Sequence, residues 1–235
     1  GLLEVLAGIR AYHARLLEAL REAGGDPALI GALERIPFAP CRDVYEALVA
    51  WNFLYYVDGC DNPGPLDAGL APYHRGEDIE PMLRAFFQNV DANNGWSGAL
   101  GPKCNDLTLQ CLRAAKGMRR PSLELRVTSD TPEAVWAAAI DSLATGCGQP
   151  ALYNEAGYQR ALAKAFPDIP REDLMRFNGG GCTETMLDGI SNVGSLDAGV
   201  NLALVFDGFL RERLCEFDDF DRFYGALIAE IRAVV

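Results

Sequence analysis

Histidine is scarce in this sequence, with only His13 and His74 among 235 residues. The zinc-binding patterns Cys-x-x-Cys and His-Glu-x-x-His are both missing, so no structural or catalytic zinc site is expected. A Ser-His-Asp triad would have to use one of the two histidines, and His13 falls in a helical repeat typical of a packed or surface residue. The phosphate loop Gly-x-x-x-x-Gly-Lys-Ser/Thr and the dinucleotide fingerprint Gly-x-Gly-x-x-Gly do not occur either.

Long apolar runs and an excess of basic residues are also missing. No run approaches the ~18 residues that a membrane helix needs. The formal net charge of -12 argues against the basic face that nucleic acids or anionic membranes require. The seven cysteines are odd in number and lack paired short spacings, so a disulfide framework is not expected. Free cysteines of this kind fit a protein of the reducing cytoplasm. The sequence therefore predicts a folded cytoplasmic protein with no metal, nucleic-acid or membrane partner.

The most informative segment is a cysteine that follows three glycines. Gly179, Gly180 and Gly181 precede Cys182, and Glu184 comes two residues later. Glycine has no Cβ, so this backbone can adopt positive φ or approach another stretch of chain closely, and it is expected to present the thiol at a loop tip. Thiol and carboxylate then share one environment, as covalent or radical catalysis with a paired acid/base requires. The alternative is a glycine turn around a buried structural cysteine.

Hydrophobic periodicity predicts a mostly helical α/β chain. Strand and helix alternate in its middle part, which suggests part of an α/β barrel with helices outside and functional loops at the strand ends. Two long polar loops are expected at residues 58–78 and 93–102. Strands are expected at 123–127 and 151–153, and helices at 2–20, 43–56, 105–116, 132–143, 156–166, 198–214 and 219–234.

The order of several motifs resembles that of the glycyl radical enzymes, the family of pyruvate formate-lyase and of glycerol and choline lyases. Gly-Cys-Thr-Glu at 181–184, followed by Asp-Ala-Gly at 197–199, is similar to the active-site loop of that family. The resemblance extends from about residue 37 to 201, and three further segments match in the right order: residues 40–48, 64–73 and 120–154.

The resemblance implies roles for residues of the cysteine loop. Cys182 matches the residue that becomes a thiyl radical and abstracts hydrogen from the substrate, and Glu184 matches the acid/base. Asp197 matches an aspartate that contacts substrate in the dehydratase-type members; it could equally be the N-cap of the helix that follows.

Three more residues are candidates for substrate binding. Asp67 lies in a segment similar to a family motif, although Gly-Pro-Leu-Asp could be a simple turn. Trp96 and Ser97 follow two asparagines and a glycine, so an indole and amides could line a pocket there. The alternative is an exposed turn, since exposed turns are also rich in asparagine, glycine and serine.

The resemblance also implies the fold, a ten-stranded α/β barrel made of two five-stranded halves. Helices lie outside it, and the cysteine loop points to the barrel centre. The chain is then a partial barrel domain, with a leading helix at 1–36, an α/β segment at 37–176, the cysteine loop at 177–197 and helices at 198–235. The C-terminal glycyl radical domain, with its Arg-Val-x-Gly-Tyr loop, is absent, and Thr185 replaces the first proline that follows Cys-x-Glu in the family. The chain alone is expected to be inactive.

A lyase or dehydratase is the activity that the resemblance implies. Pyruvate formate-lyase has two adjacent cysteines, whereas Thr183 stands beside Cys182, so C–O, C–N or C–S elimination or decarboxylation is favoured over acyl transfer. The chain would bind no cofactor itself. The family stores a glycyl radical, installed by an iron–sulfur activase that uses S-adenosylmethionine under anaerobic conditions. Expected partners are a small-molecule substrate, the activase, the remainder of the enzyme or a separate glycine-radical subunit, and a second copy in a homodimer.

Two other functions are compatible with the residues. A non-catalytic partner or scaffold subunit would keep the fold without the radical glycine. A thiol enzyme would use Cys182 as an ionic nucleophile, but it needs a nearby cation to lower the pKa of the thiol, and no histidine is near in sequence.

Overall fold

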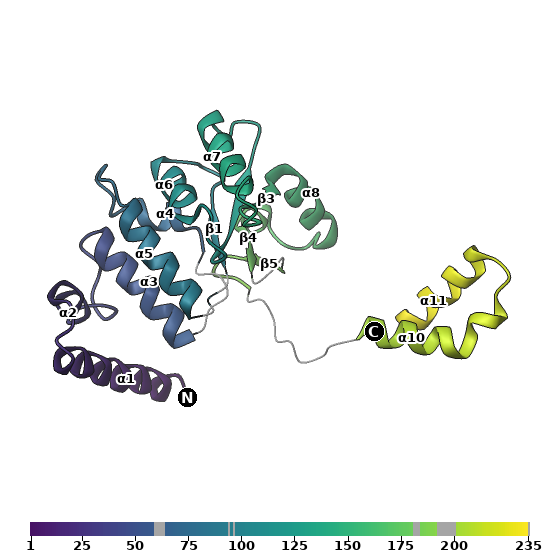
Figure 1. Cartoon of the computed structure of the whole chain (residues 1–235), viewed down its shortest axis with the longest axis horizontal. Coiled ribbons are helices and arrows are strands. Elements are labelled where there is room, and N and C mark those ends of the chain that lie inside the picture. Colours follow the sequence, from purple (N-terminus) through teal and green to yellow (C-terminus); the bar gives the residue numbers. More distant parts are fainter. Residues whose placement is uncertain (59–63, 94, 96, 181–183, 192–200, 235) are drawn as a thin grey trace. The chain divides into compact units, whose positions relative to one another are not determined.

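A computed structural model describes residues 1–58, 64–93, 95, 97–180, 184–191 and 201–234. The chain divides into two compact units, Gly1–Val193 and Gly194–Val235, and each is described by itself (Figure 1). Within the described ranges, no helix combines the length and the apolar composition needed to cross a membrane.

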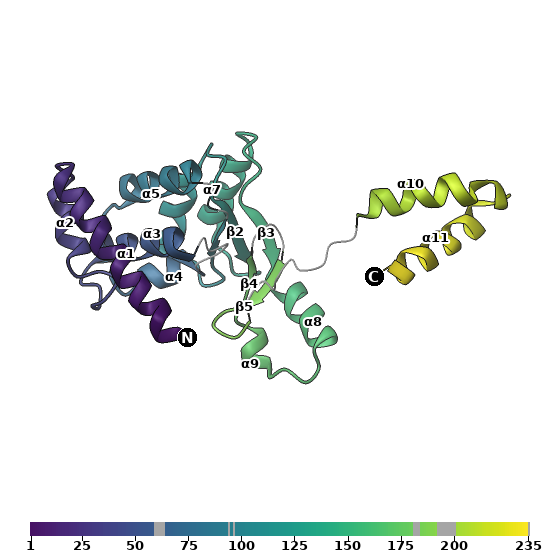
Figure 2. The same cartoon turned by 90° about the horizontal axis from the view of Figure 1, so that it is seen from below.

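Three parallel strands form the centre of the first unit. β1 (Ser97–Leu100), β2 (Ser122–Val127) and β3 (Ala151–Asn154) lie in the order β1-β2-β3, and Figure 2 labels β2 and β3 of this sheet. Parallel neighbours need a crossover connection, and α6 (Asp106–Ala115) and α7 (Glu133–Leu143) supply the two helical crossovers. This arrangement confirms the predicted α/β class with helices packed outside a parallel sheet.

Helices cover one face of the sheet. Leu100, Leu123 and Leu125 are at most 1% exposed and belong to the main hydrophobic core. That core also contains residues of α5 (Glu80–Ala92), α6 and α7. Because successive side chains of a strand point to opposite faces, the alternating Glu124 and Arg126 of β2 lie on the other face.

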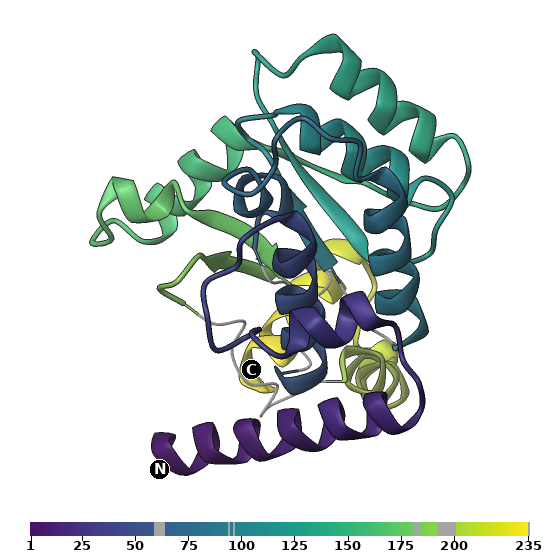
Figure 3. The same ribbon diagram turned by 90° about the vertical axis from the view of Figure 1, so that its left-hand side faces the viewer.

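An antiparallel hairpin packs on that second face. β4 (Phe177–Gly180) pairs with β5 (Glu184–Leu187), with Phe177 opposite Leu187 and Gly180 opposite Glu184. A second core joins the hairpin to Tyr153 of β3, and residues of α8 (Glu155–Ala165) and α9 (Arg171–Leu174) complete it. Figure 3 shows the hairpin on one side of the strands and the crossover helices on the other.

The amino-terminal helices form a third layer of packing. α1 (Leu2–Glu22), α2 (Pro27–Leu33) and α3 (Val44–Asp58) share a small core. The buried Nε2 of His13 lies 2.8 Å from the Leu33 carbonyl oxygen and 2.9 Å from that of Ile36. His13 is therefore a packed residue that ties α1 to the end of α2.

Two segments expected to be loops contain regular structure. Residues 58–78 include α4 (Leu66–Leu70), whose Leu66 and Leu70 are spaced to reach one face and are at most 1% exposed. Residues 93–102 include β1, whose sequence Ser-Gly-Ala-Leu has no β-branched or aromatic residue. Pairing with β2 makes it a strand, so tertiary context outweighs its weak intrinsic preference.

The second unit is a helical pair. α10 (Leu202–Arg213) leads through a short 3₁₀ turn, Leu214–Glu216, into α11 (Phe220–Val234). The ring centroid of Phe209 lies 5.7 Å from that of Phe217 and 5.6 Å from that of Phe223, which holds the pair together. The Asn201 Oδ1 accepts a hydrogen bond of 3.0 Å from the Leu204 amide, so Asn201 is the N-cap of α10.

Candidate functional site

The sheet face that bears Glu124 and Arg126 is called here the hairpin face. Both residues are buried, Glu124 with 2% and Arg126 with 5% of the whole residue's surface exposed. Their register neighbours on the same face are Ala99 and Ala151 beside Glu124, and Tyr153 beside Arg126. The two alanines are small, so the Glu124 carboxylate occupies a gap in the centre of this face.

Arg126 fixes the beginning of the hairpin. Its guanidinium donates two hydrogen bonds to the Glu155 carboxylate, at 2.8 and 2.7 Å, and a third of 2.9 Å to the Met175 carbonyl oxygen. The same guanidinium lies 4.1 Å from the ring centroid of Phe177, which also stacks on Tyr158 at 5.2 Å. A bidentate ion pair and a cation–π contact together give the first residue of β4 one defined position on the sheet.

Gly179 approaches the sheet two residues later. A Cβ built at Gly179 would lie less than 3.0 Å from three atoms of the Glu124 carboxyl group, a separation that real Cβ atoms essentially never show. A side chain at position 179 would therefore require the Glu124 carboxyl group, the end of a flexible but buried side chain, to move. Among the three glycines named from the sequence, Gly179 thus provides a close approach between segments.

Asn178 lies between these two contact residues in β4. It is fully buried, and neither atom of its carboxamide forms a hydrogen bond within the described residues. An unsatisfied buried polar group costs about 1–3 kcal/mol. Such groups in native proteins call for an explanation, and a role in binding is one. The carboxamide can donate to and accept from a bound group.

Of the two predicted catalytic residues, Glu184 begins β5, and Cys182 falls in the sequence between β4 and β5. Gly180 and Glu184 are the last described backbone pair, and three residues connect them in the sequence. Gly181 and Cys182 lie outside the described residues, as do Asp197 and Trp96. The structure brings Gly179, Gly180 and the backbone of Glu184 together on adjacent strands.

Asp67 is engaged at the carboxyl end of β1. Its carboxylate accepts hydrogen bonds from the Thr108 hydroxyl at 2.6 Å, the Gly101 amide at 2.9 Å and the Ala68 amide at 2.8 Å. Burial raises the pKa of Asp67, although these three donors act in the opposite direction. These contacts join α4, the end of β1 and the start of α6; the proposed role in substrate binding stays a prediction.

Replacing Asp67 with alanine should lower the free energy of unfolding by about 1–3 kcal/mol, because buried donors lose their acceptor. Since the pKa is raised in the folded state, the folded protein binds this proton more strongly than the unfolded chain. The contribution of Asp67 to stability should therefore fall as the pH rises from the ordinary aspartate pKa through the raised one. Urea unfolding at a series of pH values upward from the ordinary aspartate pKa should show this dependence weakened in Asp67→Asn. An alanine variant of unchanged stability but with a raised KM would instead support substrate binding.

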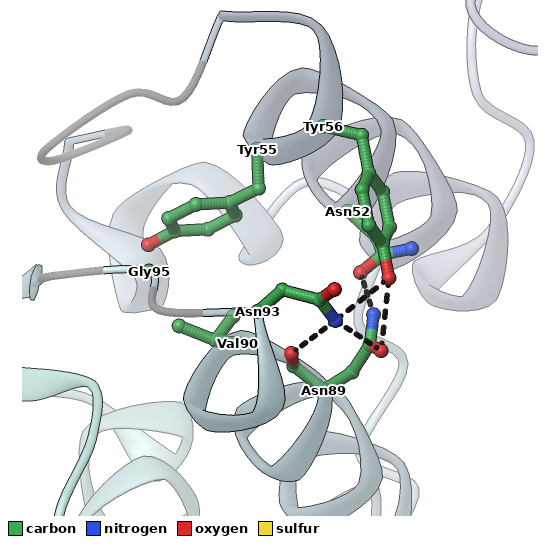
Figure 4. Close-up of a pocket in the computed structure, with 7 residues that line it drawn as sticks. All are labelled: Asn52, Tyr55, Tyr56, Asn89, Val90, Asn93 and Gly95. Atoms are coloured by element: carbon green, nitrogen blue, oxygen red, sulfur yellow. Dashed lines mark hydrogen bonds between the residues drawn. The ribbon is translucent and has the colours of Figure 1, made fainter.

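Ser97 is the first residue of β1 and is fully buried. Its carbonyl oxygen accepts a hydrogen bond of 2.6 Å from the Tyr55 hydroxyl. Tyr55 also faces a pocket of about 210 Å³ (Figure 4). In this pocket the side-chain Nδ2 of Asn93 donates to the Tyr56 hydroxyl at 3.0 Å and to the Asn89 backbone carbonyl oxygen at 2.8 Å. The pocket is lined by Asn52, Tyr55, Tyr56, Asn89, Val90, Asn93 and Gly95. Of the 93–97 segment, Asn93 and Gly95 line this pocket, and the role of Trp96 and Ser97 in substrate binding stays a prediction.

Sequence reasoning overlooked three residues of the hairpin face and hairpin. Glu124 and Arg126 alternate with leucines in Ser-Leu-Glu-Leu-Arg-Val, a pattern typical of a strand with one polar face. The sequence alone did not mark the pair, because the same pattern is typical of a strand with one solvent-exposed face; in the structure, residues 123–127 of β2 are all buried. Asn178 gave no comparable signal, since an asparagine before three glycines is also typical of an exposed turn.

Comparisons with known proteins place this geometry in a family. The chain is similar in structure to the glycerol-bound form of the B12-independent glycerol dehydratase from Clostridium butyricum, with a TM-score of 0.64 and 17% identity over 76% of this chain and 28% of that one. It is also similar to a glycyl radical enzyme from Archaeoglobus fulgidus, with a TM-score of 0.65 and 16% identity over 79% of this chain and 29% of that one.

The chain spans less than a third of the length of these two structures, and the likeness to them shows the shared barrel fold. No curated protein matches it at the level of sequence. The family model described as pyruvate formate lyase-like matches residues 95–219, which include the whole parallel sheet, the hairpin and the cysteine turn. Since this match covers more than half of the sequence, the chain belongs to the pyruvate formate lyase-like family of glycyl radical enzymes.

Proposed function

We propose that this chain carries the catalytic-cysteine region of a glycyl radical lyase or dehydratase. The observation that supports it most is the hairpin β4–β5, which is docked on the buried hairpin face of the sheet and has Cys182 in its connecting turn. The membership of the family and the Gly-Cys-x-Glu motif agree with this proposal. A small organic molecule is the proposed substrate.

In the proposed reaction, a thiyl radical on Cys182 takes a hydrogen atom from a C–H bond of the substrate, which leaves a thiol and a carbon radical. The substrate radical then loses a neighbouring oxygen, nitrogen or sulfur group, or carbon dioxide, and Glu184 moves the accompanying proton. The product radical takes the hydrogen atom back from the Cys182 thiol, so the thiyl is regenerated. Burial of the surrounding face would keep water away from these intermediates.

The radical itself would be stored on a glycine and installed by an iron–sulfur activase that uses S-adenosylmethionine. The sequence given has no Arg-Val-x-Gly-Tyr segment. The radical glycine is therefore proposed to come from another segment of the enzyme or from a separate subunit. The activase, that segment and a second copy of the chain are the proposed macromolecular partners.

Replacing Glu184 with glutamine should slow turnover of the full-length protein by roughly 10²–10⁴-fold, the usual contribution of a general acid/base. Glutamine keeps the size of the side chain but cannot exchange a proton, so hydrogen abstraction should continue. Exchange of deuterium from labelled substrate into Cys182, followed by loss of the label, would report that step separately. Turnover within a factor of about two of the parent enzyme would remove Glu184 from the mechanism.

A non-catalytic partner subunit is the second candidate, and the observation in its favour is the missing Arg-Val-x-Gly-Tyr segment. The two candidates differ in what the full-length protein does with the activase. A catalytic chain, together with the segment that bears the glycine, forms an organic radical and consumes substrate. A partner subunit does neither and instead binds a related enzyme that does.

A further inference from the structure

We infer that Glu124 is a positioning residue that sets the distance of the cysteine hairpin from the sheet, through direct contact with the backbone of Gly179. Its catalytic meaning rests on the proposed function of Cys182, whereas the contact itself does not. The pair is complementary in size: a long side chain on β2 meets a residue without a side chain on β4.

The contact is buried and direct. Glu124 is 2% exposed, and an added Cβ at Gly179 would overlap both oxygens and the carboxyl carbon of Glu124. Its register neighbours Ala99 and Ala151 are too short to fill the space between sheet and hairpin. The carboxyl group of Glu124 is therefore the part of this face that meets the β4 backbone at Gly179.

Two contacts of the same spacing attach β4 to β2. Arg126 meets Phe177, and Glu124 meets Gly179, so residues two apart in one strand contact residues two apart in the other. Such residues are about 6.6 Å apart along a strand and lie on the same face. Two points of attachment fix both the distance of β4 from the sheet and the direction of the strand. The turn with Cys182 follows directly, so a shift at Gly179 must be passed on to it.

Geometry of this kind matters for hydrogen abstraction. A misplacement of about 1 Å far from the reacting atoms can cost roughly 10²-fold in rate. A methyl group at Gly179 must move either the Glu124 carboxyl group or the β4 backbone.

The test uses four variants of the full-length protein: Gly179→Ala, Glu124→Ala, the double variant and Gly31→Ala. The control glycine lies in α2, where an added Cβ meets no atom within 4 Å. Amide hydrogen exchange of peptides covering 177–187 should be at least about tenfold faster in Gly179→Ala, because overpacking destabilises the docked hairpin. The rate at which iodoacetamide alkylates Cys182, measured by mass spectrometry, should increase together with this exchange rate. The control should match the parent protein.

The double variant distinguishes a direct contact between positions 124 and 179 from a non-specific loss of stability. Glu124→Ala leaves a gap beneath Gly179, and the methyl group of the second substitution then has room. Exchange in 177–187 should therefore return toward the parent rate in the double variant, even if Gly179→Ala alone does not fold. The inference would be overturned by a parent-like exchange rate in Gly179→Ala. It would also be overturned if hydrogen exchange in the double variant were as fast as in the two single variants.

Turnover measurements connect the contact to catalysis. In Gly179→Ala, kcat should fall by roughly 10²-fold with the yield of glycine radical unchanged, since only the position of the thiol is altered. Glu124→Gln keeps the size and should retain most of the parent kcat. If hydrogen exchange responds as expected while Cys182→Ala still turns over normally, the proposed function fails and the positioning role of Glu124 stands.

Discussion

Replacing Cys182 with alanine should abolish turnover of the full-length protein while leaving the glycine radical visible by electron paramagnetic resonance. Alanine has no S–H bond, so it can neither accept the radical nor take hydrogen from the substrate. Removing an essential covalent group typically costs about 10⁴–10⁶-fold or more. The substrate assay and the resonance signal should be recorded on the same activated sample.

A cysteine outside the proposed site provides the control. Cys215 is an exposed free thiol in the 3₁₀ turn after α10, and Cys215→Ala should leave both turnover and radical yield unchanged. If the Cys182→Ala protein turned over at the parent rate, the thiyl mechanism would be wrong. If the Cys215 variant lost activity and Cys182→Ala did not, the match of Cys182 to the catalytic cysteine of the family would be wrong.

Replacing Arg126 with methionine should lower the free energy of unfolding by about 3–5 kcal/mol, the cost of leaving one member of a buried ion pair without its partner. The side chains of Arg126 and Glu155 are 7% and 11% exposed, so water cannot take over for the missing guanidinium. Methionine keeps much of the apolar volume over Phe177. Urea unfolding, followed by far-ultraviolet circular dichroism, would measure the change.

An exposed ion pair of the same unit serves as the comparison. The Arg119 side chain is 73% exposed and lies 3.1 Å from an Asp91 carboxylate oxygen. Arg119→Met should cost no more than about 1 kcal/mol, as surface pairs usually do. Equal losses in the two variants would show that Arg126 contributes no more than a surface residue. The double variant Arg126→Met/Glu155→Met should recover part of the loss, because no charge is then buried alone.

Local patterns predicted the elements that carry their own signal. Leu123 to Val127 alternates in the sequence and forms β2, and Pro132 and Glu133 begin α7 as an N-terminal signal indicates. β1 could not be found in this way, since nothing in Ser-Gly-Ala-Leu favours a strand until β2 lies beside it. The short α4 was not predicted because its segment is rich in glycine and proline. Its two buried leucines pack against other residues only in the folded core.

The residues of the site likewise fall into those that local sequence could identify and those that it could not. Gly-Cys-x-Glu could be identified from residue types in one short segment, because thiol, carboxylate and glycines are neighbours in sequence. The contact between Glu124 and Gly179 joins two strands that are far apart in the chain and in different sheets. Predicting it requires the register of β2, the hairpin pairing and the way that one docks on the other. Periodicity alone supplies none of these.

The close approach of Gly179 to Glu124 restricts the order in which substitutions can accumulate. Any residue with a Cβ at position 179 overlaps the carboxyl group while glutamate remains at 124. A shorter residue at 124 removes that conflict, after which alanine can follow at 179. The opposite order passes through an overpacked hairpin. In a mutational scan, alanine at 179 should therefore be tolerated better on backgrounds that already carry a small residue at 124.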